Sequence, residues 1–186
     1  MPMPRLVYSV ACSLDGYNSD AGGGFDWAFP SEEVVTAIND DMADVSTFLY
    51  GRRMYETMHG WETEPEWADT PEMARFAGIW QRAEKVVYSR TLDDVVTTRT
   101  RLERELTAES IARALDAAAG DVTIEGPTLA ATAFRLGLVD VVQLLICPAI
   151  VGGGIRALPD DVRLDLRLVR ERRFDNGMVQ VTYERA

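Results

Sequence analysis

Apolar residues recur along this chain with two different periods, and the change between them predicts alternating strands and helices. Leu6–Ser13 is a nearly continuous apolar run, as in a buried strand, and residues 47–50 form a shorter run that ends at Gly51. Between them, residues 31–45 carry apolar side chains at helical spacing and acids elsewhere, which indicates a helix. The pattern then predicts the start of a helix at Arg52–Met58, a helix at Pro71–Arg82 and a strand at 85–89.

Capping and turn residues mark the elements of the second half. Thr107 suits the N-cap of a helix over residues 108–119 that Gly120 ends, and Pro127 suits the first position of a helix that runs to Gly137. The expected strands are 122–125, 139–147 and a hairpin of 163–174 and 178–184 around the turn Asp175-Asn176-Gly177.

This order of elements predicts an α/β fold whose sheet starts parallel and ends in an antiparallel hairpin. The chain contains no internal repeat, linker or low-complexity block. We therefore expect a single domain over residues 1–186.

Composition and charge narrow the classes of function. The 186 residues carry a net charge of −11, which disfavours binding to nucleic acid or to an anionic membrane, because phosphate binding needs a basic surface. No stretch approaches the roughly 18 apolar residues of a membrane span, and the N-terminus lacks the features of a signal peptide, so we expect a cytoplasmic protein. One histidine and two cysteines are too few for the usual Cys/His zinc site, and we expect no metal.

Three strand-to-helix junctions carry residues suited to binding phosphate. Gly51 ends a strand and is followed by Arg52 and Arg53 at a helix start, where free backbone N–H groups and the positive end of the helix dipole favour an anion. Residues 87–91 end a strand with two hydroxyls and a cation, and residues 124–129 again join a strand, a glycine and a helix start. Because open α/β sheets bind ligands at strand ends, we expect one basic rim on an acidic protein.

Five segments, in this order and spacing, resemble the dihydrofolate-reductase-like family, and in particular the reductase domain of riboflavin biosynthesis and its bacterial relatives. They are SLDGY (13–17), GRRMYE (51–56), VVYSRTL (86–92), IEGPTLA (124–130) and LVDVVQLLICPAIVGGG (138–154). The resemblance implies a three-layer α/β/α fold with a mixed, mainly parallel sheet, and it implies NADPH as the cofactor.

The resemblance also implies which residues contact NADPH. The phosphates are assigned to Gly51, Arg52, Arg53 and Met54, the 2′-phosphate region to Ser89 and Arg90, the pyrophosphate to Glu125, Gly126, Pro127, Thr128 and Leu129, and the nicotinamide to Ala11 and the Tyr17–Asn18 stretch. Arginines and hydroxyls without an acid for the ribose favour NADPH over NADH.

The third junction departs from the family pattern. Relatives usually carry Gly-Gly there, often with a cis peptide, whereas this chain has Glu125-Gly126. A cis bond between non-proline residues costs about 2.5–4 kcal/mol, and a glutamate places a negative charge near phosphates. Both effects would weaken cofactor binding.

Residues 152–157 (GGGIRA) fit a loose dinucleotide-binding fingerprint. The fingerprint needs a helix immediately afterwards, and Pro159 with the two following acids argues against a long one. We therefore expect a tight turn or bulge there.

The substrate side offers aromatic residues and acids, and hydride transfer needs little beyond a positioned nicotinamide, an apolar wall and sometimes a proton donor. The candidate pocket residues are Tyr17, Trp27 and Trp61, and the candidate proton donors are Asp15, Asp26 and Glu33. Each acid also has a structural interpretation: Asp15 precedes Gly16 and can form a turn, and Asp26 and Glu33 flank a helix start, where acids are favoured.

These features predict an NADPH-dependent reductase of a small pterin-, pyrimidine- or carbonyl-type substrate. Residues 18–27 do not reproduce the Leu-Pro-Trp segment and helix-borne acid of dihydrofolate reductases, and the first strand lacks the lysine usual in 5-amino-6-(5-phosphoribosylamino)uracil reductases. The alternative, which Glu125 favours, is a non-catalytic module that binds a nucleotide-like ligand. A homodimer formed through the exposed edge of the C-terminal hairpin is compatible with either function.

Overall fold

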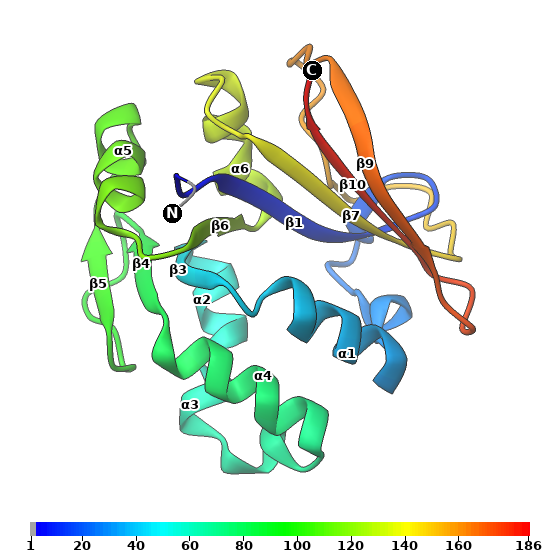
Figure 1. Cartoon of the computed structure of the whole chain (residues 1–186), viewed down its shortest axis with the longest axis horizontal. Coiled ribbons are helices and arrows are strands. Elements are labelled where there is room, and N and C mark those ends of the chain that lie inside the picture. The colour runs from blue at the N-terminus through cyan, green and yellow to red at the C-terminus, as the bar shows by residue number, and fades with distance from the viewer. Residues whose placement is uncertain (1–2) are drawn as a thin grey trace.

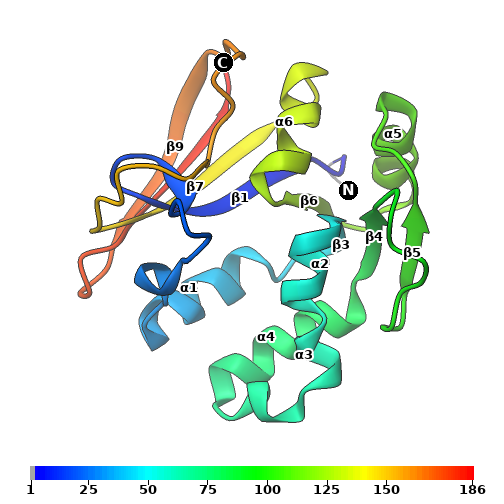
Figure 2. The same ribbon diagram turned by 180° about the vertical axis from the view of Figure 1, so that it is seen from behind.

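Eight strands form the central sheet. They are β1 (Leu6–Ser13), β3 (Val45–Gly51), β4 (Glu84–Tyr88), β5 (Thr100–Glu103), β6 (Asp121–Glu125), β7 (Val141–Cys147), β9 (Leu166–Arg173) and β10 (Val179–Arg185). The computed structural model describes residues 3–186, and in it the strand order is β5-β4-β3-β6-β1-β7-β10-β9 (Figures 1 and 2). The pairs from β5 to β7 are parallel, and β10 runs antiparallel to both β7 and β9.

Helices cover both faces of this sheet (Figure 1). One face carries α1 (Glu32–Asp41), α2 (Arg52–Met58), α3 (Gly60–Thr63) and α4 (Pro71–Arg82), and the other carries α5 (Ala108–Ala117) and α6 (Pro127–Arg135). The three-layer α/β/α fold with a mixed, mainly parallel sheet and an antiparallel C-terminal hairpin is therefore confirmed. Within residues 3–186, no helix has the length and apolar character that crossing a membrane requires.

Alternation of side chains along the strands separates two cores. On β3, Phe48 and Tyr50 pack with Trp80 of α4, whereas Leu49 between them packs with Ile124 in the core beneath α5 and α6. All five side chains are fully buried. Burying a large apolar side chain stabilises the fold by about 1.5–3 kcal/mol. Because successive side chains of a strand point to opposite faces, the period of two decides which strand residues face which helix layer.

Most element boundaries agree with those expected from the sequence, and two differ for local reasons. The helix expected over residues 31–45 ends at Asp41, because the chain turns at Met42 and Val45 already pairs with Asp121 as the first residue of β3. The strand expected from residue 163 begins at Leu166.

Three strands were not expected: β5, and the two short strands β2 (Tyr17–Ser19) and β8 (Ile155–Arg156), which pair with each other. β2 and β8 contain three and two residues, too few to show a period. β5 lies at one edge of the sheet and has the mainly polar sequence TRLE, so no buried apolar pattern marks it.

Residues 152–157 form the expected turn. Gly152 and Gly154 have positive φ angles of 74° and 134°, and the chain then enters β8. A Cβ built on Gly154 would overlap the carbonyl oxygen of Ser19, so glycine is required where this turn passes β2.

The outer strand of the C-terminal hairpin, β9, forms the other edge of the sheet, as its expected role in self-association requires. Its apolar side chains Leu166, Leu168 and Val169 are exposed. Homodimerisation through this edge stays a prediction.

Candidate functional site

Two of the three junctions lie side by side at the carboxyl ends of the neighbouring strands β3 and β6. A Cβ built on Gly51 would lie 3.8 Å from the Cβ of Leu129, and one built on Gly126 would lie 3.5 Å from the Cβ of Met54. Each glycine therefore packs against the first turn of the helix that follows the other glycine, and in Figure 2 both helices, α2 and α6, lie toward the viewer. Gly126 also has a φ of +90°, which favours glycine at this turn.

The helices that begin at these junctions have no side-chain cap. The residues that precede α2 and α6 are Gly51 and Gly126, which have no side chain to accept a hydrogen bond. By contrast, the hydroxyls of Thr70 and Thr107 accept hydrogen bonds from first-turn N–H groups of α4 and α5. An anion at this edge would satisfy uncapped N–H groups and would gain from the dipole of α6.

The remaining junction (residues 87–91), at the end of β4, is joined to the Gly51 junction by a side-chain hydrogen bond. Nη1 of Arg52 donates to the hydroxyl of Thr91 at 3.0 Å. The buried Ser89 hydroxyl accepts hydrogen bonds from the N–H groups of Thr91 at 3.2 Å and Leu92 at 3.0 Å, so Ser89 shapes the turn. The structure thus brings all three junctions together at the carboxyl ends of the parallel strands, and 'this edge' below means that end of the sheet.

Arg104 also lies at this edge, although the sequence pattern does not single it out. It follows β5, which pairs with β4, and its Nη1 donates to the carbonyl oxygens of Ser89 at 3.1 Å and Leu92 at 2.7 Å. The signal that could have identified Arg104 is β5 itself, because the residue after a parallel strand lies at the same edge as the other strand ends.

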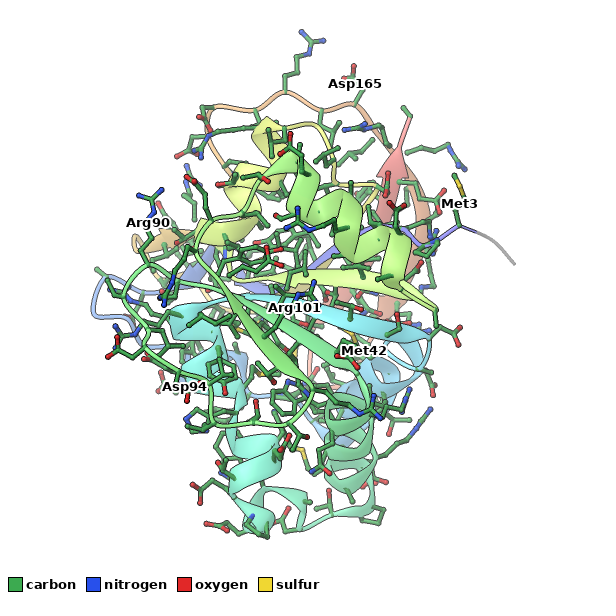
Figure 3. The ribbon with its side chains drawn as sticks, turned by 90° about the vertical axis from the view of Figure 1, so that its left-hand side faces the viewer. Met3, Met42, Arg90, Asp94, Arg101 and Asp165 are labelled. Carbon is green, nitrogen blue, oxygen red and sulfur yellow. The ribbon has the colours of Figure 1, made fainter. Side chains whose placement is uncertain are left out.

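The expected arginines of the rim are exposed, and two of them pair with glutamates. Nε of Arg52 lies 2.6 Å from Glu56 Oε1, and Nη2 of Arg90 lies 2.7 Å from Glu105 Oε1. Figure 3 shows Arg90 at the molecular surface, and Arg53 is exposed as well. Exposed ion pairs contribute about 0–1 kcal/mol, so a phosphate can compete for either paired arginine at small cost.

Glu125 is buried on the face of the sheet that α1, α2 and α4 cover. It pairs in register with Tyr50, whose side chain packs on that face, and only 7% of Glu125 is exposed. Burial raises the pKa of its carboxyl group to about 8, because no cation or hydrogen-bond donor among residues 3–186 offsets the loss of water. The carboxyl group is protonated at neutral pH, so it does not add the negative charge that the sequence suggested. The Glu125–Gly126 peptide bond is trans.

The β1–α1 segment (residues 14–31) follows β1, which lies between β6 and β7 in the sheet. Ala11 of β1 and Trp27, in the 3-10 helix η1 (Asp26–Ala28), pack against the same buried cluster under α1. The side-chain amide of Asn18 donates to the Ala11 carbonyl oxygen at 3.2 Å. Residues expected near the nicotinamide and the substrate therefore come together at the end of β1.

The other two aromatic candidates have different surroundings. The Arg156 guanidinium lies 5.1 Å from the centre of the Tyr17 ring, in the small sheet of β2 and β8. Trp61 of α3 packs edge-on against Trp67 and Phe76, with ring centres 5.3 and 4.8 Å apart. Trp61 thus belongs to the core near α4, and the structure does not bring it to η1.

Asp15 connects two loops. Its carboxylate accepts hydrogen bonds from the N–H groups of Val151 at 3.2 Å and Gly152 at 2.8 Å. Hydrogen bonding, first from Ser13 and then from these backbone groups, lowers the pKa of Asp15 to about 2. A carboxylate with this pKa is ionised at neutral pH and has no proton to donate.

Glu33 and Asp26 lie at the start of α1 and in η1. Oε2 of Glu33 accepts a hydrogen bond from the N–H group of Asp175 at 3.1 Å, which ties α1 to the turn of the C-terminal hairpin. Asp26 is exposed in the first turn of η1. Their catalytic roles stay predictions, whereas Glu125, directly before Gly126, is a buried acid.

A family model matches the chain over nearly its whole length. It describes the RibD C-terminal domain and matches residues 4–180. The chain belongs to the RibD C-terminal domain family. The resemblance carried by the five sequence segments is thereby confirmed.

Individual relatives extend over the same length. YyaP of Bacillus subtilis is 27% identical over 185 residues, which cover 96% of this chain and 94% of that protein. A solved structure described as a riboflavin biosynthesis protein, from Shewanella sp. PV-4, has a TM-score of 0.74 at 20% identity and covers 98% of this chain and 99% of its own. Dihydrofolate reductase from Enterococcus faecalis, complexed with NADP(H), has a TM-score of 0.63 at 15% identity and covers 97% and 96%. These structures share the fold of this chain.

Proposed function

We propose that this protein is an NADPH-dependent reductase that transfers hydride to a small organic substrate. The observation that carries the proposal is the meeting of three phosphate-suited junctions at one edge, where Gly51 and Gly126 pack against each other's helices and Arg52 bonds to Thr91. The shared fold with an NADP(H)-complexed dihydrofolate reductase and the RibD family membership support it.

The residues of this edge fit the phosphates of NADPH. The uncapped start of α6 offers backbone N–H groups to the pyrophosphate. Arg90, with Arg104 after the neighbouring strand β5, supplies cations for the 2′-phosphate. NADPH supplies the hydride when it is bound, and the chain's residues hold and orient it.

We assign the proton donor to Glu125. Reduction of a polar double bond needs a proton as well as a hydride, and a general acid works best when its pKa lies near the working pH. The Glu125 carboxyl group keeps its proton up to about pH 8 and lies on the same sheet face as Ala11, on the neighbouring strand. Turnover should therefore fall as the pH rises through about 8.

Calorimetric titration with NADPH and NADH tests the cofactor assignment. Wild-type protein should bind NADPH at micromolar concentration and more tightly than NADH. Arg52→Ala with Arg90→Ala should weaken NADPH binding at least tenfold, because each lost charged hydrogen bond contributes about 1.5–3 kcal/mol, and it should weaken NADH binding less.

The matched control is Arg135→Ala with Arg167→Ala, which removes two exposed, ion-paired arginines from other parts of the surface. It should leave both affinities unchanged. Equal losses for NADPH and NADH in the first variant would contradict the 2′-phosphate assignment. Absence of binding at millimolar NADPH would contradict the proposed function.

Binding without turnover is the alternative, and the unpartnered carboxyl group of Glu125 favours it, since that group can hydrogen-bond a ligand that is not reduced. NADPH oxidation, followed by absorbance with carbonyl and pterin-type compounds, separates the two functions. Glu125→Gln should abolish oxidation and spare NADPH affinity if Glu125 donates the proton. A binding module would oxidise NADPH with none of these compounds.

A further inference from the structure

We infer that the cofactor and a proton bind together, and that Glu125 is the residue that takes up the proton. The inference rests on the proposed function, because it concerns the phosphate-binding part of the same site. Two observations carry it: Glu125 directly precedes the uncapped start of α6, and its carboxyl group is buried without a partner among residues 3–186.

The place of Glu125 in the chain brings its carboxyl group close to a phosphate-suited helix start. Glu125 is the last residue of β6, and Gly126, which follows it, is the N-cap residue of α6 (Figure 1). The first turn of α6 contains no acid, so the positive potential of its N–H groups has no counter-charge within the helix start. A pyrophosphate bound there and an ionised Glu125 would be like charges close together, and like charges repel strongly where water is excluded.

The burial of Glu125 makes its charge state sensitive to such an anion. Only 7% of the residue is exposed, and burial raises the pKa of the carboxyl group to about 8. The group therefore keeps its proton at neutral pH and loses it above pH 8. A buried charge is screened little by salt, so a phosphate at the start of α6 raises this pKa further. Cofactor binding above pH 8 then requires the uptake of a proton.

The titratable groups of the surrounding strands do not carry a charge that would hold Glu125 ionised. Tyr50, in register on β3, and Tyr8 of β1 are buried, and burial raises the pKa of both phenols above the usual value. Trp80 of α4 donates to the Tyr50 hydroxyl at 3.0 Å and brings no charge. The buried Lys85 of β4 donates instead to two carbonyl oxygens at the end of α4, at 3.0 and 3.2 Å.

The charged groups of the neighbouring helices do not offset an ionised Glu125 either. At the start of α2, Arg52 pairs with Glu56, and Arg53 is exposed. On α1, the buried Asp41 has two arginine partners of its own. Burial is therefore the cause that sets the pKa of Glu125, and a bound phosphate would be the first strong charge to act on it.

The coupling connects the cofactor to the proposed chemistry. Reduction of a polar double bond consumes one hydride and one proton, and we assign the proton to Glu125. Because phosphates at the start of α6 hold that proton on Glu125, the site contains both when the cofactor binds.

Calorimetry measures the proton directly and without turnover. Full-length protein is titrated with NADPH at pH 8.5 in EPPS and in Tris, two buffers of different ionisation enthalpy, and the difference in heat gives the number of protons taken up. Wild-type protein should take up about half a proton or more per site, because about three quarters of a group with this pKa is ionised at pH 8.5. Glu125→Gln should bind NADPH without this uptake. The control Glu171→Gln, which removes an exposed carboxyl group of β9, should match wild type.

Affinity against pH and a cofactor fragment give independent measurements. Between pH 7 and pH 9 the wild-type Kd for NADPH should rise by up to about tenfold, whereas that of Glu125→Gln should change by less than about twofold. The fragment 2′-phospho-ADP-ribose has the same phosphates and no nicotinamide, so it should take up the same proton as NADPH.

Three results would overturn the inference. They are NADPH binding at pH 8.5 without proton uptake, equal uptake by wild type and Glu125→Gln, and uptake with NADPH that 2′-phospho-ADP-ribose does not reproduce. If NADPH binds at no pH, the proposed function fails. If NADPH binds and no uptake depends on Glu125, only the present inference fails.

Discussion

Two buried carboxyl groups on the same side of the sheet have opposite surroundings. The side chain of Asp41, at the end of α1, is 7% exposed, and Glu125, at the end of β6, is exposed to the same small extent. Asp41 Oδ1 lies 2.7 Å from Arg170 and 3.3 Å from Arg172, and its Oδ2 accepts hydrogen bonds from two glutamine amides at 2.9 Å. Glu125 has no such partner among residues 3–186.

The difference separates a carboxylate that holds elements together from a carboxyl group for which we propose a function. The groups around Asp41 come from β7, β9 and β10, so this carboxylate holds the C-terminal hairpin against α1. The surroundings of Glu125 provide no reason within the fold for a carboxyl group. Burial of a group without a partner destabilises the protein, and such groups concentrate at functional sites.

The largest effect is expected from Glu125→Gln, measured as stability against pH. The folded protein keeps the Glu125 proton up to about pH 8, whereas the unfolded chain releases it above about 4.5. The contribution of this group is therefore fully present below pH 4.5 and is lost as the pH rises through 8, by up to about 5 kcal/mol at about 1.4 kcal/mol per pH unit. Urea unfolding should find the variant as stable as wild type near pH 4.5 and more stable at pH 8.

A constant difference between Glu125→Gln and wild type across this pH range would show that Glu125 is not a buried, protonated acid. Asp41 and Glu125 would then not differ in the way described.

A smaller effect, of opposite sign, is expected from Asp41→Ala. It leaves two arginines and two glutamine amides without their acceptor, and breaking a buried pair costs about 3–5 kcal/mol, reduced here because both arginines are partly exposed. We expect a loss of about 3 kcal/mol in the free energy of unfolding, with NADPH affinity unchanged below the unfolding temperature. The neighbouring Asp40→Ala, which breaks an exposed pair with Arg75, should cost less than about 1 kcal/mol.

The smallest effect is expected from Glu105→Gln, which frees Arg90 from an exposed ion pair. Stability should change by less than about 0.5 kcal/mol, while NADPH affinity should rise a few-fold, because a competing carboxylate is removed. Calorimetry and urea unfolding on one preparation measure both. A large loss of stability would mean that ion pairing, and not burial, determines how much a carboxylate contributes to the free energy of unfolding in this protein.

Much of the fold could be predicted from local patterns. The apolar run of Leu6–Ser13, the cap Thr107 and the turn around Gly177 each mark an element that the structure contains at that place. β5 could not be predicted in this way, because its stability comes from pairing with β4 and not from its own polar sequence. Arg104, which follows β5, was missed for the same reason.

Some features of the candidate site also follow from local sequence, and others follow only from tertiary packing. The sequence alone determined that glycines and arginines follow strands at Gly51, Arg90 and Gly126, because strand ends and helix starts are local features. Only the tertiary structure decided that β6 lies between β3 and β1, so that two glycines distant in sequence pack against each other's helices. It also decided the protonation of Glu125, since desolvation depends on side chains that packing brings from other strands and helices, and no local pattern encodes them.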